Sequence, residues 1–232
     1  MSSTAALARS IRRERQEDGP LTSQMRESLK LMTEPAIKSR PVYPGLKPDR
    51  YAKSNVVAID EDGRDAFLEM AKTVDDRFLR NTTVLFVKGR PNGHDPVAPL
   101  EALGLVNLWV FPSLETLIAR LNGLLSISRM GMRLYAAGNE PLIGLVVKTA
   151  LSHGIVHSSI MTEHRGSLRR RVQCVHCKGI TENVTTNPAK CSHCGLMLLV
   201  RDHYSRRIGA FQGVCIDAEV PGEIPEIKAE FL

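Results

Sequence analysis

Two pairs of cysteines constrain this chain more than any other feature of its sequence. Cys174 and Cys177 form one Cys-x₂-Cys pair, and Cys191 and Cys194 form a second, with thirteen residues between the pairs. Two tight turns that face each other across a short hairpin can hold four sulfur atoms tetrahedrally, about 2.3 Å from one Zn²⁺ ion. The spacing therefore predicts a zinc ribbon whose metal ligands are these four cysteines.

Disulfide bonds and iron are the alternatives to zinc at these cysteines. The first residues show no signal-peptide pattern, so a reducing, cytoplasmic location is expected, and this disfavours disulfides. A single iron ion or an iron–sulfur cluster also takes four thiolates. However, the loop TENVTTNPAK between the pairs is polar and has no aromatic residue. It offers little apolar cover for a redox centre, so zinc is favoured over iron.

The residues beside the two pairs are expected to shape the turns. Gly179 and Gly195 follow the pairs where the chain leaves each turn, a position that often requires positive φ. His176 and His193 lie inside the pairs and are expected to point outward, because four sulfurs complete the coordination sphere. Cys215 stands alone in the sequence and is expected to be a small buried apolar residue.

The composition is that of a globular chain with an uneven charge. Of its 232 residues 43% are hydrophobic, and no apolar run reaches the roughly 18 residues that span a bilayer. The net charge is +6, and basic residues gather near the cysteines, above all in the run Arg169 to Arg171. We interpret them as balancing the thiolates. A nucleic-acid-binding zinc ribbon is the alternative, disfavoured because aromatic side chains are not interleaved with the basic ones.

Strand and helix patterns alternate upstream of the cysteines. Short apolar runs predict five strands, at residues 56–59, 82–89, 105–111, 132–137 and 155–160. The clearest helix between them has Asn139 as its N-cap and ends before Gly154. Another is predicted over 63–79, capped by Asp60 or Asp62. Parallel strands joined by helices predict an α/β fold with a doubly wound, mostly parallel sheet.

Four segments are predicted along the chain. They are an extended or disordered N-terminal arm (1–53), an α/β domain (54–165), a zinc ribbon (166–214) and an acidic C-terminal tail (215–232). The proline-rich stretch from Pro35 to Tyr51 and the tail are expected to lie along a partner protein. The apolar anchors in the tail would be Val220, Ile224, Ile227 and Phe231. The alternative is that both ends pack on this chain's own domains.

Residues 134–155 resemble the end of the nicotinamide-binding module of ferredoxin reductase-type flavoproteins. In that family an aromatic residue, any residue and Cys-Gly-Pro precede a helix. Here Tyr135 and Gly138 match, whereas Ala137 and Asn139 replace the family's Cys and Pro. The resemblance implies a nucleotide-binding module that uses NADPH, with Gly138 near the cofactor.

The stretch VLFVKGR resembles the second strand of the same module. It places Gly89 and Arg90 at the turn that meets the adenosine phosphate in that family, so the resemblance implies that they bind cofactor. The first strand departs from the pattern, because Asp60, Glu61 and Asp62 stand where a glycine-rich phosphate cradle would follow. Like charges about 4 Å apart repel by roughly 1–4 kcal/mol. We therefore predict that the isolated chain binds NADPH weakly or not at all.

No catalytic constellation is found in the sequence. His153, His157 and His164 lie near the end of the predicted sheet, as does Glu163. If these side chains converge, they could form a metal or acid–base site. A solvated sheet edge is the favoured interpretation of these residues. No catalytic residue is therefore assigned to this chain.

The stretch LVRDHYSRRIGAFQG after the cysteines, with KSRPVYPGLKPDRY far upstream, resembles the small zinc-ribbon subunit (DmmA-type) of bacterial dimethylamine monooxygenase. The resemblance implies an NADPH-dependent, multisubunit oxidoreductase that uses O₂ to convert dimethylamine to methylamine and formaldehyde. It further implies that haem belongs to an oxygenase subunit, and flavin and an iron–sulfur centre to a reductase subunit. This chain would then be an accessory or coupling subunit, not catalytic alone. A nucleotide-binding reductase module and a nucleic-acid-binding zinc-ribbon protein are the alternatives.

Overall fold

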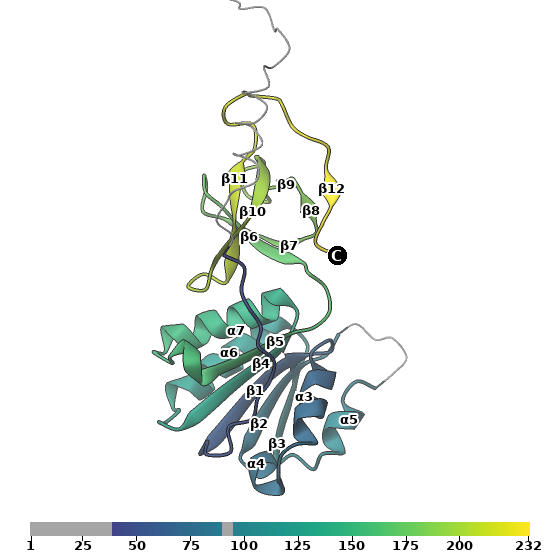
Figure 1. The fold of residues 1–232 in the computed structure, drawn as a ribbon, viewed down its shortest axis with the longest axis vertical. Helices are drawn as coiled ribbons and strands as arrows, with labels where there is room; N and C mark the ends of the chain where they lie inside the picture. Colours follow the sequence, from purple (N-terminus) through teal and green to yellow (C-terminus); the bar gives the residue numbers. More distant parts are fainter. Residues whose placement is uncertain (1–38, 90–94) are drawn as a thin grey trace, which may run out of the picture. The chain divides into compact units, whose positions relative to one another are not determined.

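The computed structural model describes residues 39–89 and 95–232, and Figure 1 shows the arrangement of their helices and strands. The predicted cofactor residue Arg90 and most of the predicted N-terminal arm lie outside the described residues. The described part of the chain forms two sheets of five strands each and one sheet of two strands. No helix within this part is long and apolar enough to cross a membrane.

The first sheet is parallel throughout. Its strands are β1 (Ser54–Asp60), β2 (Thr82–Val87), β3 (Asn107–Phe111), β4 (Met132–Gly138) and β5 (Ile160–His164). They lie in the order β3-β2-β1-β4-β5, and every neighbouring pair is parallel. The chain adds β2 and then β3 on one side of β1, and afterwards adds β4 and then β5 on the other side. This confirms the doubly wound α/β fold, whose strand order reverses between β1 and β4.

Helices cover both faces of this sheet (Figure 1). They are α3 (Arg64–Ala71), α4 (Asp76–Arg80), α5 (Ala98–Glu101), α6 (Leu114–Ser126) and α7 (Glu140–Ser152). In β1, Val57 and Ile59 pack in one core with apolar residues of α3, α4 and α5. Val56 and Ala58 pack in a second core with those of α6 and α7. Successive side chains of a strand point to opposite faces, so a continuous apolar run is buried on both.

Helix α7 begins and ends where the sequence predicts. The side chain of Asn139 accepts a hydrogen bond from the Leu142 N–H at 3.0 Å, which satisfies one of the free donors at the helix start. The chain leaves the helix through Gly154, whose φ is 74°, a conformation that glycine adopts without strain. The predicted cap and stop signals are therefore confirmed.

Two predicted elements are wrong. The helix predicted over 63–79 is two helices, because Asp75 accepts the Phe78 N–H at 2.9 Å and starts α4 afresh. The fifth strand is not residues 155–160, where a short 3₁₀ helix (η1, His157–Ser159) lies, but Ile160–His164. This edge strand is only half-buried and carries polar residues, so its apolar signal is weaker than that of the run before it.

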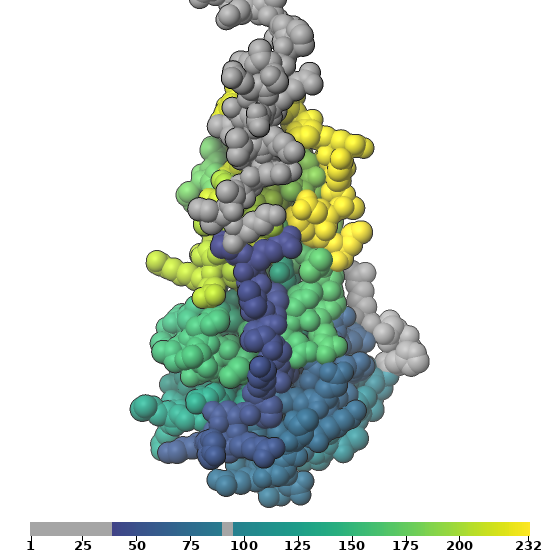
Figure 2. Space-filling view, viewed as in Figure 1, coloured from purple at the N-terminus to yellow at the C-terminus, as the bar shows by residue number. Residues whose placement is uncertain are grey.

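The described residues of the N-terminal arm form a strap on the sheet domain (Figure 2). We call residues 39–53 the strap. Gly45 N–H donates to the Thr162 carbonyl at 3.1 Å, and Lys53 N–H donates to Gly131 at 2.9 Å. The Asp49 carboxylate pairs with Arg133 at 2.7 Å. The strap is extended as predicted, but this part of it packs on its own chain, which was the alternative to a partner.

The four paired cysteines belong to the second five-stranded sheet, where Cys174 ends a strand and the other three lie in the turns between strands. Its strands, in spatial order, are β7 (Ile180–Val184), β6 (Arg170–Cys174), β11 (Ala210–Cys215), β10 (Met197–Ser205) and β9 (Ala189–Lys190). A small core holds it together, which includes Val172, Leu198 and Phe211. We call this sheet, with the short strand β8 (Thr186–Asn187), the ribbon.

The end of the chain packs on the ribbon. Strand β12 (Lys228–Ala229) pairs antiparallel with β8 (Thr186–Asn187), and Phe231 is only 2% exposed. The prediction that Phe231 anchors a partner is therefore wrong, because its ring is part of the ribbon core. The other three predicted anchors, Val220, Ile224 and Ile227, are exposed.

Candidate functional site

The four predicted ligand cysteines converge in the ribbon. All four Sγ atoms lie within 4.8 Å of one another. Cys174 Sγ lies 3.8 Å from Cys194 Sγ, and Cys177 Sγ lies 3.7 Å from Cys191 Sγ. A tetrahedron with about 2.3 Å from its centre to each corner has edges of about 3.8 Å. Sulfurs in a disulfide would be about 2.05 Å apart, so the spacing is that of a metal site.

The two turns that carry the cysteines have the same backbone design. In the first turn the Lys178 N–H donates to the Cys174 carbonyl at 2.9 Å, and in the second the Gly195 N–H donates to Cys191 at 3.1 Å. Lys178 has φ of 63° and Gly195 has φ of 79°. The left-handed residue is thus the one directly after each pair. The sequence signal is correct for Gly195 but assigns the first turn to Gly179 instead of Lys178.

Gly179 has a different role from the predicted one. A side chain at this position would collide with the ring of His193. The Nε2 atom of His193 lies 3.0 Å from the Ile180 carbonyl, so its ring is held beside the first turn and away from the sulfurs. His176 is exposed. Neither histidine belongs to the group of potential metal ligands formed by the four cysteines, as the sequence predicts.

The four thiols do not share one pKa, because their surroundings shift the pKa of Cys191 and that of Cys194 in opposite directions. Burial opposes ionisation of Cys191, but backbone N–H groups of Cys194 and His193 outweigh it and lower the pKa of Cys191 to about 6. For Cys194, a hydrogen bond from Leu196 lowers the pKa, but burial and the neighbouring thiols raise it to about 12. Four thiolates this close repel one another, and a divalent cation between them removes that repulsion. The donor set and its spacing fit one tetrahedral metal ion.

Cys215 is separate from this cluster. It is half-buried, where the sequence predicts a buried residue, and its Sγ donates to Asp217 Oδ1 at 3.1 Å. That hydrogen bond raises the pKa of the Cys215 thiol. The residue makes a local turn contact and is not a metal ligand.

The carboxyl edge of the first sheet is where open α/β sheets bind nucleotides, at the point where the strand order reverses. Here Asp60, the last residue of β1, occupies that point. Its Oδ1 accepts the Gly63 N–H at 2.9 Å and its Oδ2 accepts the Asn139 N–H at 3.0 Å. The side chain is buried, and burial raises the pKa of Asp60 to about 6 against these hydrogen bonds. The N–H groups that would hold a phosphate are therefore already engaged.

The next two acids turn toward other glycines along the same edge. A side chain at Gly138 would collide with Asp60, one at Gly89 with Glu61, and one at Gly166 with Asp62. Gly138 ends β4, and Gly89 follows β2. The predicted cofactor residues Gly89 and Gly138 are thus brought to one edge of the sheet, where each lies against a carboxylate of this chain.

The histidines near the sheet end do not form a site. His153 Nε2 lies 2.8 Å from Asn122 Oδ1, and the His164 ring stacks on Tyr43 at 5.6 Å. Glu163 accepts the Leu46 N–H at 2.9 Å. Among the described residues, the four cysteines are the one group of metal-binding side chains close enough to share an ion.

Comparison with known proteins identifies the family. The profile described as dimethylamine monooxygenase subunit DmmA-like, N-terminal domain, matches residues 35–160, and the C-terminal domain of the same description matches residues 171–214. The chain belongs to the DmmA-like family. The two matched ranges cover most of the first sheet and the ribbon with its cysteines.

One curated relative and several solved structures resemble this DmmA-like chain. The heme-dependent oxidative N-demethylase delta subunit of Ectopseudomonas mendocina (strain ymp) is 35% identical over 111 residues, which are 48% of this chain and 63% of that protein. Phthalate dioxygenase reductase is 15% identical with a TM-score of 0.41, covering 62% of this chain and 46% of that one. An intact type IV self-sufficient cytochrome P450 monooxygenase is also 15% identical with a TM-score of 0.41, covering 71% and 21%.

The basic run before the cysteines of this DmmA-like chain is not a surface patch. Arg170 is 4% exposed, and its guanidinium lies between the rings of Phe211 and Phe231, 4.0 and 3.9 Å from their centroids. It also donates to Asp202 at 2.9 Å. Arg171 is 7% exposed and donates to Glu182. Sequence reasoning missed this, because the aromatic partners of Arg170 are far from it along the chain.

Proposed function

We propose that this chain is an accessory subunit of a multicomponent monooxygenase that demethylates dimethylamine with NADPH and O₂. Haem would belong to an oxygenase subunit, and flavin and an iron–sulfur centre to a reductase subunit. The observation that carries the proposal is the family match over both folded parts of the chain. The name of the 35% identical relative, a delta subunit of a heme-dependent N-demethylase, supports a place in such a complex.

We infer that the cysteine cluster binds one structural Zn²⁺ ion. Cys174, Cys177, Cys191 and Cys194 supply all four positions of a tetrahedron, so no position is left for substrate or water. When bound, the ion supplies no reaction step but ties the two turns of the ribbon together. The choice of zinc over iron rests on the sequence of residues 181–190, which has no aromatic residue; the ribbon core itself covers Cys174 and Cys191, which are 0% and 2% exposed.

We further infer that the α/β domain is a scaffold in which the nucleotide site has been lost. Asp60 holds the N–H groups of Gly63 and Asn139 that a phosphate would need. This weighs against the reductase-module alternative. The buried state of Arg170 and Arg171 weighs against the nucleic-acid alternative, because a buried guanidinium is not available to phosphates.

We propose that the chain is divided into four segments, with the boundaries expected from the sequence. The arm (1–53), α/β domain (54–165), ribbon (166–214) and tail (215–232) would be separable in sequence, although Phe231 of the tail contributes to the ribbon core. We propose a cytoplasmic location, where four thiols stay reduced and available to a metal.

The test is reconstitution of the complex. The full-length chain, carrying an affinity tag, is co-expressed with the haem subunit and the flavin reductase subunit encoded by the same organism. We expect the three to co-purify and to oxidise NADPH only when dimethylamine is added. Omitting this chain should uncouple or abolish that reaction while leaving the haem and flavin spectra of the other subunits unchanged. Full amine-dependent turnover without this chain would refute the proposal.

A further inference from the structure

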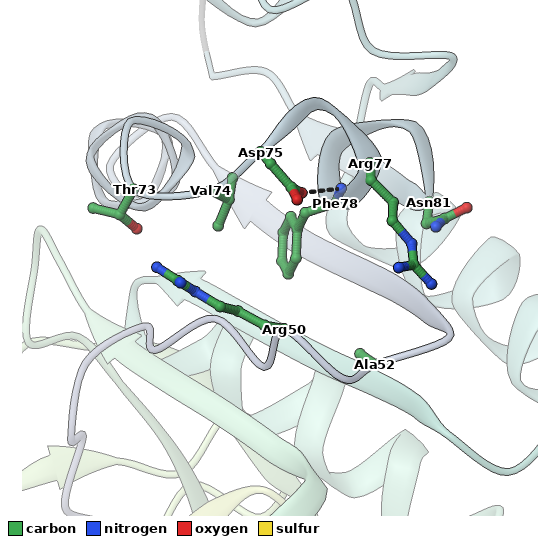
Figure 3. Close-up of a pocket in the computed structure, with 8 residues that line it drawn as sticks. All are labelled: Arg50, Ala52, Thr73, Val74, Asp75, Arg77, Phe78 and Asn81. Carbon is green, nitrogen blue, oxygen red and sulfur yellow. Dashed lines mark hydrogen bonds between the residues drawn. The ribbon is translucent and has the colours of Figure 1, made fainter.

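A cavity lies at the edge of the first sheet opposite to Asp60, where the strands begin. It has a volume of about 300 Å³ and lies between the strap and the segment that forms α4. Ala52 and Asn81 in its lining come just before β1 and β2. Figure 3 shows the Phe78 ring pointing into this space. Small-molecule pockets span about 300–1,000 Å³, so the cavity has the size for a compact ligand.

Two arginines give this cavity its charge. Arg50 of the strap and Arg77 of α4 both line it, with their guanidinium groups on either side of the Phe78 ring in Figure 3. Neither guanidinium forms an ion pair or a hydrogen bond with another described residue. Asp75 also lines the cavity, but its Oδ1 accepts the Phe78 N–H at 2.9 Å and is engaged in starting α4. The lining therefore carries two cations without an ion-pair partner among the described residues and one carboxylate, which leaves an excess of positive charge.

One buried residue holds both walls of the cavity in place. The hydroxyl of Tyr135 accepts the Asp49 N–H at 2.9 Å, which fixes the strap next to Arg50. The ring of Tyr135 meets that of Phe78 edge-on, at 6.1 Å between centroids. Tyr135 is fully buried. Because Tyr135 attaches the strap backbone and the Phe78 ring to the core, only the exposed arginine side chains would have to be ordered on binding.

We propose that this cavity binds a small organic anion, a carboxylate or phosphate joined to a compact apolar group. A guanidinium is a planar donor that matches the oxygens of either anion. Val74 and Phe78 would contact the apolar group. The site lies away from the cysteines and from Asp60, so it is independent of the proposed accessory function and is tested on the isolated, zinc-loaded full-length chain.

The first experiment is a calorimetric titration with phenyl phosphate as the probe. We expect saturable binding that weakens as salt is raised, because the attraction is electrostatic. Inorganic phosphate should bind more weakly, since it lacks the apolar group. Benzylamine, a cation of similar size, is the matched control and should not bind. Benzoate in place of phenyl phosphate separates the two anions, and absence of saturable binding by both, or equal binding of benzylamine, would overturn the proposal.

The second experiment locates the site with paired variants. Arg77→Ala should weaken phenyl phosphate binding about tenfold or more, as expected for loss of a charged hydrogen-bond donor. Arg80→Ala on the same helix lies outside the cavity lining and should have little effect. Arg50→Ala and Lys47→Ala form the same comparison on the strap. Equal losses within either pair would contradict the assignment, and unchanged melting temperatures exclude unfolding as the cause.

Discussion

The cysteine cluster and the carboxyl edge of the first sheet both gather groups that can become anions. Their negative charges are stabilised in different ways. Four thiols converge on one point, with Sγ atoms as close as 3.7 Å. At the sheet edge, Asp60, Glu61 and Asp62 turn toward three different glycines, and Asp60 accepts two N–H groups of its own chain. The first cluster needs a cation from outside, and the second does not. The difference arises because the four thiols point toward one another, whereas the three carboxylates point apart.

The largest effect is expected from removing one thiol. Cys191→Ser should abolish metal binding and unfold the ribbon, since metal binding contributes on the order of 10–16 kcal/mol in small zinc modules. Elemental analysis and a thermal melt measure the two consequences. Cys215→Ser is the matched control and should keep one metal ion per chain. If the wild-type chain instead holds iron, with visible thiolate charge-transfer absorption, the zinc assignment is wrong.

The stability of the ribbon also depends on the last residues of the chain. Phe231→Ala should lower the free energy of unfolding of the ribbon by about 3–5 kcal/mol, as for other fully buried phenylalanines. The loss includes the contact between its ring and Arg170. Ile227→Ala, at an exposed position, should change stability by about 0.5 kcal/mol or less. Denaturant unfolding followed at the ribbon would reveal whether the two variants differ.

Asp60 predicts a pH dependence at the sheet edge. Burial raises its pKa from an ordinary 3.8 to about 6 in the folded chain, against hydrogen bonds from Asn139 and Gly63. The folded chain therefore binds this proton more tightly, so the associated stability is present below about pH 4 and is lost as pH rises through about 6. The wild-type free energy of unfolding should fall by about 2–3 kcal/mol relative to Asp60→Asn over this range.

Denaturant unfolding at several pH values measures this difference, because other titrating groups are common to both proteins. Asp65→Asn, at an exposed position on α3, is the control and should follow the wild type. A constant difference between the wild type and Asp60→Asn would mean that the hydrogen bonds to Asp60 fully offset its burial.

The smallest effect is expected from NADPH. Because the edge of the sheet is filled by its own acids, the isolated chain should show no saturable heat of binding at micromolar to low-millimolar NADPH. Low-micromolar affinity for NADPH would contradict this expectation, since the acids at the sheet edge would then have to move aside to admit the phosphates. A matched titration of the reductase partner provides the positive control.

Local features of the sequence determined much of the fold and the convergence of four cysteines. The spacing of Cys174, Cys177, Cys191 and Cys194 predicts two facing turns, and the structure brings the four Sγ atoms within 4.8 Å of one another. Alternating apolar runs predict the parallel sheet, and Asn139 and Gly154 mark the ends of α7. Each of these signals lies within one turn, one strand or one helix, so a local pattern records it even where the elements then pair over long distances in the chain.

The tertiary structure alone decided how the other charged residues are used. Asp60 meets the N–H of Asn139, 79 positions later in the chain, and Arg170 enters the space between Phe211 and Phe231. The sequence shows an acidic turn and a basic run, which are typical of solvated surface. Whether such a group is exposed or buried depends on partners that long-range packing brings to it, and burial in turn requires those partners. That is why Arg170 and Phe231 are buried where the sequence suggests exposure, whereas the four cysteines converge as predicted.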